Sequence, residues 1–174
     1  MIRLAVPAFA LTSLLLVGCG DGELKYAPAC PQLSLLAEGA DLVRFSGAGR
    51  DVTDRVVEAR ISGVEAKCAA GRRGDVVATV RVRADVARGP AGRGRSAQVP
   101  YFVAVMQGDA VLDRQEFVLT ANFQPNVDTA RVAGDEVELR FAGAGDRGAT
   151  AYRIIVSLVL TEEELAHNRR AGAR

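Results

Sequence analysis

The sequence predicts an all-β protein, an immunoglobulin-like or fibronectin-like β-sandwich of about seven or eight strands with a short C-terminal helix. Apolar and polar residues alternate in most segments beyond residue 30, which is the period of a half-buried strand. Turns rich in glycine and proline separate these segments at the close spacing of a sandwich. No long segment carries the helical period that a parallel α/β sheet requires.

The first strands are expected around Gly39 and Gly63. The segment 33–45 is divided at Gly39 and predicts two short strands, although its leucine-rich start is also compatible with a helical turn. In the segment 57–68 the apolar residues move from odd to even positions at Gly63, which is typical of a β-bulge. The segment 76–86 alternates regularly, with valine and alanine at the even positions, and predicts a half-buried strand.

Four later segments complete the predicted sheets. The segment 101–106 follows Pro100, and proline is tolerated at the start of a strand. The segments 117–123 and 137–141 alternate in the same way as the earlier strands. The segment 152–160 is apolar on both phases, which predicts a central strand that is covered on both sides.

One helix is expected at the C-terminal end of the domain. Thr161 and Glu164 have the spacing of a capping box, in which each side chain accepts a hydrogen bond from the other residue's backbone N–H. The helix is expected to end near Arg169. Residues 30–169 would then form one β-sandwich domain with its helix, and residues 170–174 a frayed tail.

The composition excludes several classes of protein. A chain of 174 residues with 49% apolar and 25% charged residues is typical of one folded domain and not of a disordered chain. Lysine and arginine number 22 and aspartate and glutamate 21, so the net charge of +1 gives no overall attraction to nucleic acid. A single histidine leaves few catalytic arrangements and no histidine-rich metal site.

The first eighteen residues have the anatomy of a secretory signal peptide. Arg3 gives a positive start, and residues 4–17 are almost entirely apolar. This apolar run is shorter than the roughly 20 residues that cross a bilayer as a helix. A buried N-terminal helix is the alternative, but a core helix rarely opens with a charge and ends in Gly-Cys.

Residues 16–19, with the sequence Leu-Val-Gly-Cys, resemble the lipobox of bacterial lipoproteins. The resemblance implies cleavage before Cys19 and acylation of its thiol, and several acyl chains anchor a protein durably. Residues 19–29 would then be a tether. Gly20 follows the cysteine where an aspartate would indicate the inner membrane, which favours the outer membrane.

A wider resemblance covers most of the mature chain. The segments Tyr101–Val105 and Leu160–Arg169, together with Cys30-Pro31 and Arg88-Gly89-Pro90, resemble a group of α-proteobacterial lipoproteins without an assigned activity. The resemblance implies an envelope location and this fold, and no particular function.

Cys30 and Cys68 are expected to form a disulfide. Once Cys19 is acylated, they are the remaining pair of thiols, and paired thiols beyond the inner membrane usually oxidise. Cys68 also falls on the inward phase of its strand. Two separate buried thiols are the alternative.

The candidate chemistry favours no enzyme. His167 is the one imidazole, no serine lies in a Gly-x-Ser-x-Gly motif, and the usual zinc ligands are too few. Carboxylates at 162–164 and elsewhere could converge, but their positions suit a helix N-terminus and solvated strand faces. The glycine-rich segments 47–49 and 143–145 suit hairpin turns and not phosphate loops. We therefore expect no catalytic residue, cofactor or metal ion.

The segment 88–95 is the most unusual loop of the sequence. It carries Arg88, Arg93 and Arg95 among glycines and contains no acidic residue. It is either a solvated connection between strands or a contact for an anion or a partner, because arginine offers a planar fork to phosphate and carboxylate groups.

Together these observations predict a lipid-anchored protein that faces the periplasm and serves as a binding or envelope-assembly module. Its expected partners are the membrane through the N-terminal lipid, and another envelope protein or an anionic lipid or lipopolysaccharide. The alternatives are an accessory structural subunit of a secretion or transport complex and an envelope hydrolase that uses carboxylates.

Overall fold

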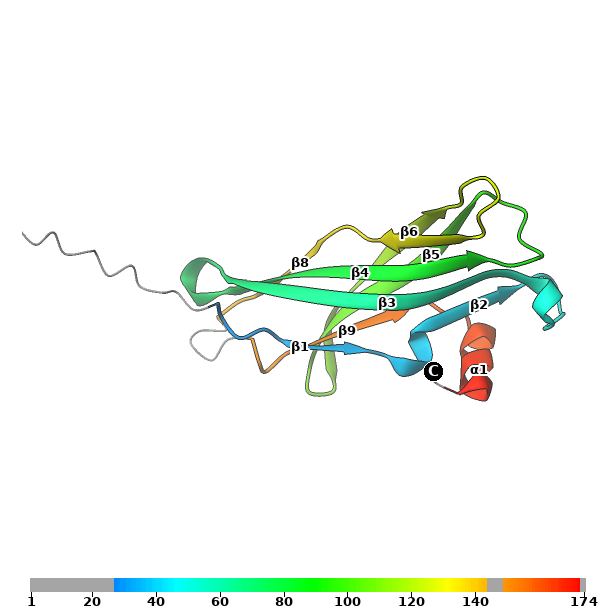
Figure 1. The fold of residues 1–174 in the computed structure, drawn as a ribbon. Helices are drawn as coiled ribbons and strands as arrows, with labels where there is room; N and C mark the ends of the chain where they lie inside the picture. The colour runs from blue at the N-terminus through cyan, green and yellow to red at the C-terminus, as the bar shows by residue number, and fades with distance from the viewer. Residues whose placement is uncertain (1–26, 144–148, 173–174) are drawn as a thin grey trace, which may run out of the picture.

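The computed structural model describes residues 27–143 and 149–172, and it confirms an all-β sandwich with a short C-terminal helix (Figure 1). Nine strands among the described residues form two sheets, so the expectation of seven or eight was too low. The predicted signal peptide, Cys19 and the tether up to residue 26 lie outside the described residues. In the part of the chain that is described, no helix combines the length and the apolar character needed to cross a membrane.

The first sheet has four strands in the order β1, β9, β5, β6. β1 covers Gln32–Leu35 and runs parallel to β9, which covers Arg153–Leu158. β9 pairs antiparallel with β5 (Ser96–Gln107), and β5 forms a hairpin with β6 (Ala110–Asn122). β9 therefore lies inside the sheet, as its apolar sequence on both phases predicts.

The second sheet is built around two long antiparallel strands, β3 (Arg55–Ala70) and β4 (Val76–Arg88). β2 (Asp41–Phe45) pairs with β3, whereas β7 (Thr129–Ala133) and β8 (Val137–Phe141) pair with opposite halves of β4. β2, β3 and β4 are thus neighbours in chain order, while the sheets of an immunoglobulin domain have the orders ABED and CFG.

Within residues 27–143 and 149–172, three short 3-10 helices lie between strands. η1 (Ala37–Gly39) joins β1 to β2, and η2 (Val52–Asp54) precedes β3. η3 (Arg72–Gly74) makes the tight turn between β3 and β4. The leucine-rich start of segment 33–45 was compatible with a strand or a helical turn. It forms a strand, because Leu33 and Ser34 belong to β1.

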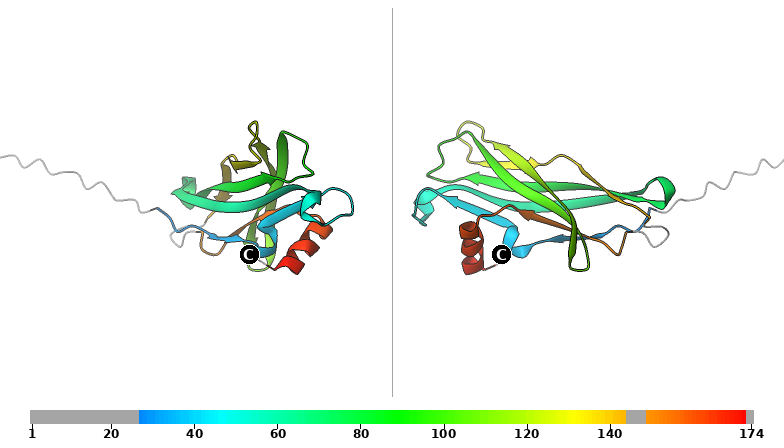
Figure 2. Two further views of the ribbon diagram at one scale, coloured as in Figure 1. Left: turned by 45° about the vertical axis from the view of Figure 1, so that its right-hand side comes forward. Right: turned by 180° about the vertical axis from the view of Figure 1, so that it is seen from behind.

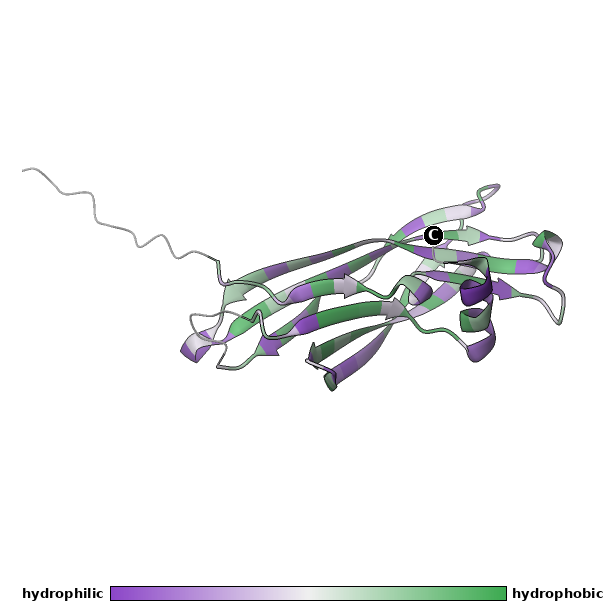
Figure 3. Cartoon of the chain, turned by 90° about the horizontal axis from the view of Figure 1, so that it is seen from below, coloured by the Kyte–Doolittle hydropathy of each residue, from purple (hydrophilic) through white to green (hydrophobic). Residues whose placement is uncertain are grey.

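The two sheets are arranged as two layers (Figure 2), and the hydrophobic core lies between them. Hydrophobic and hydrophilic residues alternate along the strands (Figure 3). The predicted phase of β4 is confirmed, because each even position from 76 to 86 is at most 1% exposed: Val76, Ala78, Val80, Val82, Ala84 and Val86. The first sheet contributes alternate residues of β5 and β6 to the same core, among them Tyr101, Val103, Leu119 and Ala121. Hydrophobic burial of this kind supplies most of the favourable free energy of folding.

The change of phase at Gly63 is a β-bulge, as predicted. Ile61 pairs with Ala84 and Gly63 pairs with Arg83, which leaves Ser62 as the extra residue. The bulge keeps the apolar side of β3 toward the core on both sides of the slip.

Pro100 lies within β5 and does not open it, because the strand begins at Ser96. The carbonyl oxygen of Pro100 accepts a hydrogen bond from the N–H of Val159 at 2.9 Å, just past the end of β9. The N and O atoms of one residue in an antiparallel strand point to the same neighbour. The missing N–H of Pro100 therefore faces this end of β9, and the pairing of β5 with β6 loses no hydrogen bond.

The C-terminal helix α1 covers Glu162–Ala171 and has the predicted capping box. The Thr161 hydroxyl accepts from the N–H of Glu164 at 3.2 Å, and the Glu164 carboxylate accepts from the N–H of Thr161 at 2.8 Å. The helix continues to Ala171, so Arg170 is helical and not part of a frayed tail.

The predicted disulfide between Cys30 and Cys68 is present, with the two Cα atoms 5.6 Å apart. Cys30 precedes β1 and Cys68 lies near the end of β3, so the bridge joins the start of the described fold to the second sheet. We call this end of the sandwich, which includes the turn η3, the entry end. The opposite end, where Arg55 begins β3 and Arg88 ends β4, is the distal end (Figure 1).

Candidate functional site

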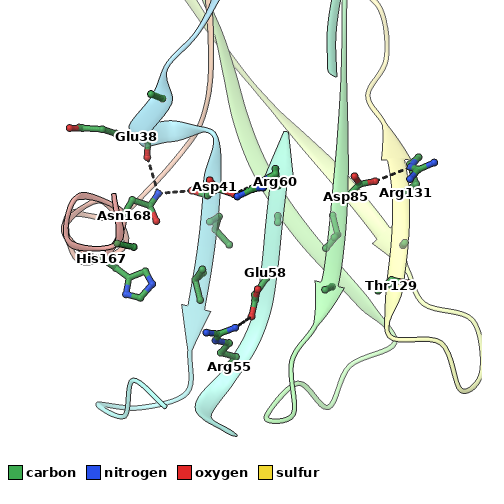
Figure 4. Close-up of a pocket in the computed structure, with 18 of the residues that line it drawn as sticks. Glu38, Asp41, Arg55, Glu58, Arg60, Asp85, Thr129, Arg131, His167 and Asn168 are labelled. Atoms are coloured by element: carbon green, nitrogen blue, oxygen red, sulfur yellow. Dashed lines mark hydrogen bonds and ion pairs between the residues drawn. The ribbon is translucent and has the colours of Figure 1, made fainter. Parts of the chain in front are cut away.

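The outer face of the second sheet carries a groove of about 540 Å³, with strands β2, β3, β4 and β7 as its floor and helix α1 as one wall (Figure 4). Every strand of the floor contributes outward-facing residues, and those of β3 and β4 come from the distal halves of these two long strands. The groove was not predicted from the sequence, because it depends on which strands lie side by side.

A row of alternating charges crosses the floor of this groove. Asp41, Arg60, Asp85 and Arg131 are successive partners on the four neighbouring strands. Arg60 Nε lies 2.5 Å from Asp41 Oδ1, and Arg131 Nε lies 2.9 Å from Asp85 Oδ1. The hydrogen bond to Asp41 and its negative charge raise the pKa of Arg60, and Asp85 raises the pKa of Arg131 in the same way.

A second row runs beside the first and is less charged. Val43, Glu58, Ala87 and Thr129 are successive partners across the same strands. Arg55 forms an ion pair with Glu58, so the one carboxylate of this row is also neutralised. Ala87 and Thr129 line the groove with small side chains.

Helix α1 forms the wall along the edge strand β2. The Asn168 amide nitrogen donates to the carbonyl oxygens of Asp41 at 2.7 Å and of Glu38 at 2.8 Å, so it occupies backbone acceptors at this edge (Figure 4). A helix over a strand edge also prevents pairing with another chain. His167 packs edge-on against Phe45, with the ring centroids 5.3 Å apart.

One partly buried ion pair holds the helix in place. Arg44 Nε donates to Glu164 Oε1 at 3.0 Å, and the Glu164 side chain is 9% exposed. Glu164 therefore caps the helix and ties it to β2 at the same time. Arg169 adds a more exposed pair with Glu38 at 3.0 Å.

The chemistry of the groove suits binding. Its guanidinium groups and carboxylates alternate along one line, so they can accept and donate hydrogen bonds to a polar, extended ligand such as a peptide. The carboxylates of the charged row each face an arginine. Among the described residues, no three histidine, cysteine, aspartate or glutamate side chains gather as metal ligands would.

The three arginines of the predicted loop have different surroundings. Arg88 belongs to β4, and its guanidinium pairs with Asp128 at 2.5 Å and stacks over the ring of Phe123. Arg93 and Arg95 are exposed, and no side-chain hydrogen bond or ion pair joins either of them to another described residue. The loop therefore offers two unpaired guanidinium groups and not three.

The loop is also held more firmly than its glycines predict. Gly89 donates to the carbonyl oxygen of Val56 at 3.0 Å, and Ala91 donates to that of Arg55 at 2.9 Å. Arg88 Nη1 donates to the carbonyl oxygen of Gly94 at 3.1 Å. Gly89 also lies so close to the Arg55 carbonyl group of β3 that a Cβ atom would not fit there.

Comparison with known protein families, with curated protein sequences and with solved structures found no match for this chain. The candidate site therefore rests on its geometry. Of the residues singled out in the sequence, Cys30 and Cys68 are brought together in the disulfide. Arg88 is engaged in an ion pair, unlike Arg93 and Arg95, and Cys19 lies outside the described residues. The outward-facing charges at alternate strand positions were the sequence signal for the groove.

Proposed function

We propose that this protein is a lipid-anchored periplasmic binding module that presents its groove to another envelope component away from the membrane. The acyl chains on Cys19 would hold the chain in the membrane, with the outer membrane favoured. The module would bind through its surface and would not catalyse a reaction. The groove fits a polar, extended segment of a partner protein.

The observation that carries this proposal is the separation of the entry end from the groove. The groove residues of β3 span Arg55–Arg60, whereas the disulfide residue Cys68 lies 8 to 13 positions further along the same strand. At about 3.3 Å per residue this places the groove roughly 25–45 Å from the disulfide. A chain that is anchored through the entry end would therefore hold its groove clear of the lipid surface.

The disulfide would strengthen the attachment of the tether to the fold. Force or drag on a tethered domain acts first where the tether meets the fold, which is at Cys30. The covalent bond to β3 passes that load to the longest strand of the second sheet, because β3 contains 16 residues.

Acylation is tested by labelling cells with a fatty-acid analogue. Wild-type protein should incorporate the label, and Cys19→Ser should remain an unlabelled precursor because the thiol is the acceptor. A Thr129→Ser variant, which changes an exposed residue of the groove, is the matched control and should be labelled like the wild type. Equal labelling of the wild type and Cys19→Ser would contradict the proposal that Cys19 carries the lipid anchor.

Binding is tested by photocrosslinking in living cells with the full-length protein. A photoreactive amino acid at Thr129 lies in the groove, and one at Glu138 lies on an exposed position of β8 outside it. We expect a discrete protein adduct from position 129 and none from position 138. The same adducts from both positions, or no adduct from 129, would contradict a binding role for the groove.

A further inference from the structure

The turn between β3 and β4 exposes two arginines at the entry end. Arg72 and Arg73 lie in η3, and no side-chain hydrogen bond or ion pair joins either of them to a residue in the described ranges. Lys67, near the end of β3, is also exposed and has no carboxylate within ion-pair distance among the described residues. We call Lys67, Arg72 and Arg73 the basic turn.

The acidic groups beside the basic turn have other partners. Asp75 follows the turn, but its carboxylate is half-buried and accepts from the N–H of Gly143 at 3.2 Å. Glu138 on the neighbouring strand β8 pairs with Arg140 at 3.3 Å. Glu65, two residues before Lys67, pairs with Arg83. The three cations of the basic turn therefore exceed the one nearby carboxylate, that of Asp75, whose charge no arginine or lysine of the described residues balances through an ion pair.

The basic turn lies beside the point where the chain enters the fold. Arg72 is four residues beyond Cys68, which is bonded to Cys30, so the turn is within about 15 Å of the bridge even if the chain between them is extended. Figure 1 shows the turn and the start of the described chain at the same end of the sandwich. Cys30 lies eleven positions after Cys19 in the sequence, a stretch of chain that spans at most about 40 Å.

We propose that the basic turn contacts the anionic phospholipid headgroups of the membrane that holds the anchor, so that the sandwich stands on its entry end. This inference rests on the proposed acylation of Cys19. The tether keeps the turn at high local concentration near the lipid surface. Lysine and arginine close to an anionic surface are attracted to it within a Debye length, so even a few such residues orient a tethered domain.

The two ends of the molecule thus have different roles. The exposed Arg93 and Arg95 lie at the distal end, roughly 40 Å from the basic turn along the 13 residues of β4. This distance keeps them beyond the reach of headgroups when the molecule stands on its entry end. They remain available to an acidic partner, as the sequence suggested for that loop.

The orientation is measured with the full-length acylated protein reconstituted in vesicles. The chain has three cysteines, of which one would be acylated and two form the disulfide, so Gln124→Cys adds a single reactive thiol at the distal end. A donor dye on this thiol and an acceptor on lipid headgroups report by energy transfer how far the distal end stands from the membrane. Vesicles of phosphatidylcholine alone are compared with vesicles that also contain phosphatidylglycerol.

Energy transfer from the distal dye to the headgroups should be low in the anionic vesicles, because the distal end stands away from the membrane. It should rise when Arg72→Gln and Arg73→Gln are combined. We expect the ratio of upright to tilted molecules to fall about 30-fold, which equals about 2 kcal/mol at 1.4 kcal/mol per tenfold change. High salt should have the same effect on the wild type. The matched control combines Arg93→Gln with Arg95→Gln, which removes the same charge from the distal end and should leave the transfer unchanged.

Two results overturn the inference, and they can be told apart. An intact mass without acyl chains overturns the anchoring proposal and the membrane contact with it. Acylated protein whose energy transfer is the same in neutral and anionic vesicles, or changes equally in the two arginine pairs, overturns the membrane contact alone.

Discussion

Replacing Gly89 by alanine tests whether the loop of residues 88–95, at the distal end, is held against β3 or is flexible. A Cβ atom at this position would lie 2.6 Å from the carbonyl carbon of Arg55 and closer still to its oxygen. Both atoms belong to the backbone of β3, so no side chain can rotate away to relieve the clash. The loop must lift from β3 to accommodate the methyl group.

The size of the effect follows from the hydrogen bonds that would break. Lifting the loop loses the bond from Gly89 to Val56 at 3.0 Å and the bond from Ala91 to Arg55 at 2.9 Å. Each contributes about 1 kcal/mol, and residual strain adds to them, so we expect a loss of about 2–4 kcal/mol in the free energy of unfolding. For a domain of this size that loss lowers the melting temperature by about 4–16 °C.

Thermal and denaturant unfolding of the purified protein measure this effect. The control is Gly94→Ala in the same loop, where the nearest atom to an added Cβ is the Ser96 carbonyl oxygen at 3.2 Å. We expect this control to change stability by less than about 1 kcal/mol. If Gly89→Ala melts within a degree or two of the wild type, the loop moves freely. The conclusion that hydrogen bonds to β3 hold the loop of Arg93 and Arg95 in place is then wrong.

Three further predictions concern the helix, the bridge and the core. Glu164→Ala should cost about 2 kcal/mol in chemical denaturation, because it removes one of the two hydrogen bonds of the capping box and the pair with Arg44, whereas Glu164→Gln keeps that hydrogen bond and should cost about half as much. Combined Cys30→Ser and Cys68→Ser should lower stability by about 3–4 kcal/mol, since a bridge across 38 residues restricts the unfolded chain, and an unchanged melting temperature would contradict this. Burial raises the pKa of Tyr101, so the stability that this phenol contributes is complete below about pH 10 and is lost as the pH rises through the raised pKa. Tyr101→Phe should therefore unfold less steeply than the wild type between pH 10 and 12 in a titration followed by circular dichroism, and identical profiles would refute the assignment.

The sequence predicted eight of the nine strands because their periodicity is local. Burial follows the phase of the alternation in β4 and β8, and even the bulge at Gly63 was visible as a change of phase. β7 (Thr129–Ala133) was missed although it is as long as β8, because its two inward side chains, Ala130 and Val132, are only half-buried and give a weaker apolar alternation than the three buried ones of β8. A short strand of this kind gains its order from pairing with β4, which no local pattern records.

The candidate groove was beyond prediction for a related reason. Alternation shows that Arg60 and Asp85 face outward, but it does not show that they are opposite each other. That relation depends on the register of β3 against β4, and the bulge shifts the register by one residue. Similarly, the pairing of Arg88 with Asp128 joins residues 40 positions apart and converts an apparently free arginine into a structural one.

The position of α1 links the stability of the helix to the proposed binding. The helix contributes His167 and Asn168 to the groove wall, and Arg44 holds it to β2 through Glu164. A ligand that contacts both the helix and the strand floor binds only when α1 is packed on β2. The ligand then stabilises this packing, and the packing in turn strengthens ligand binding by the same free energy. Loss of the Glu164 contact should therefore weaken a groove ligand while leaving the membrane contact of the basic turn unaffected, because the two surfaces lie at opposite ends of β3.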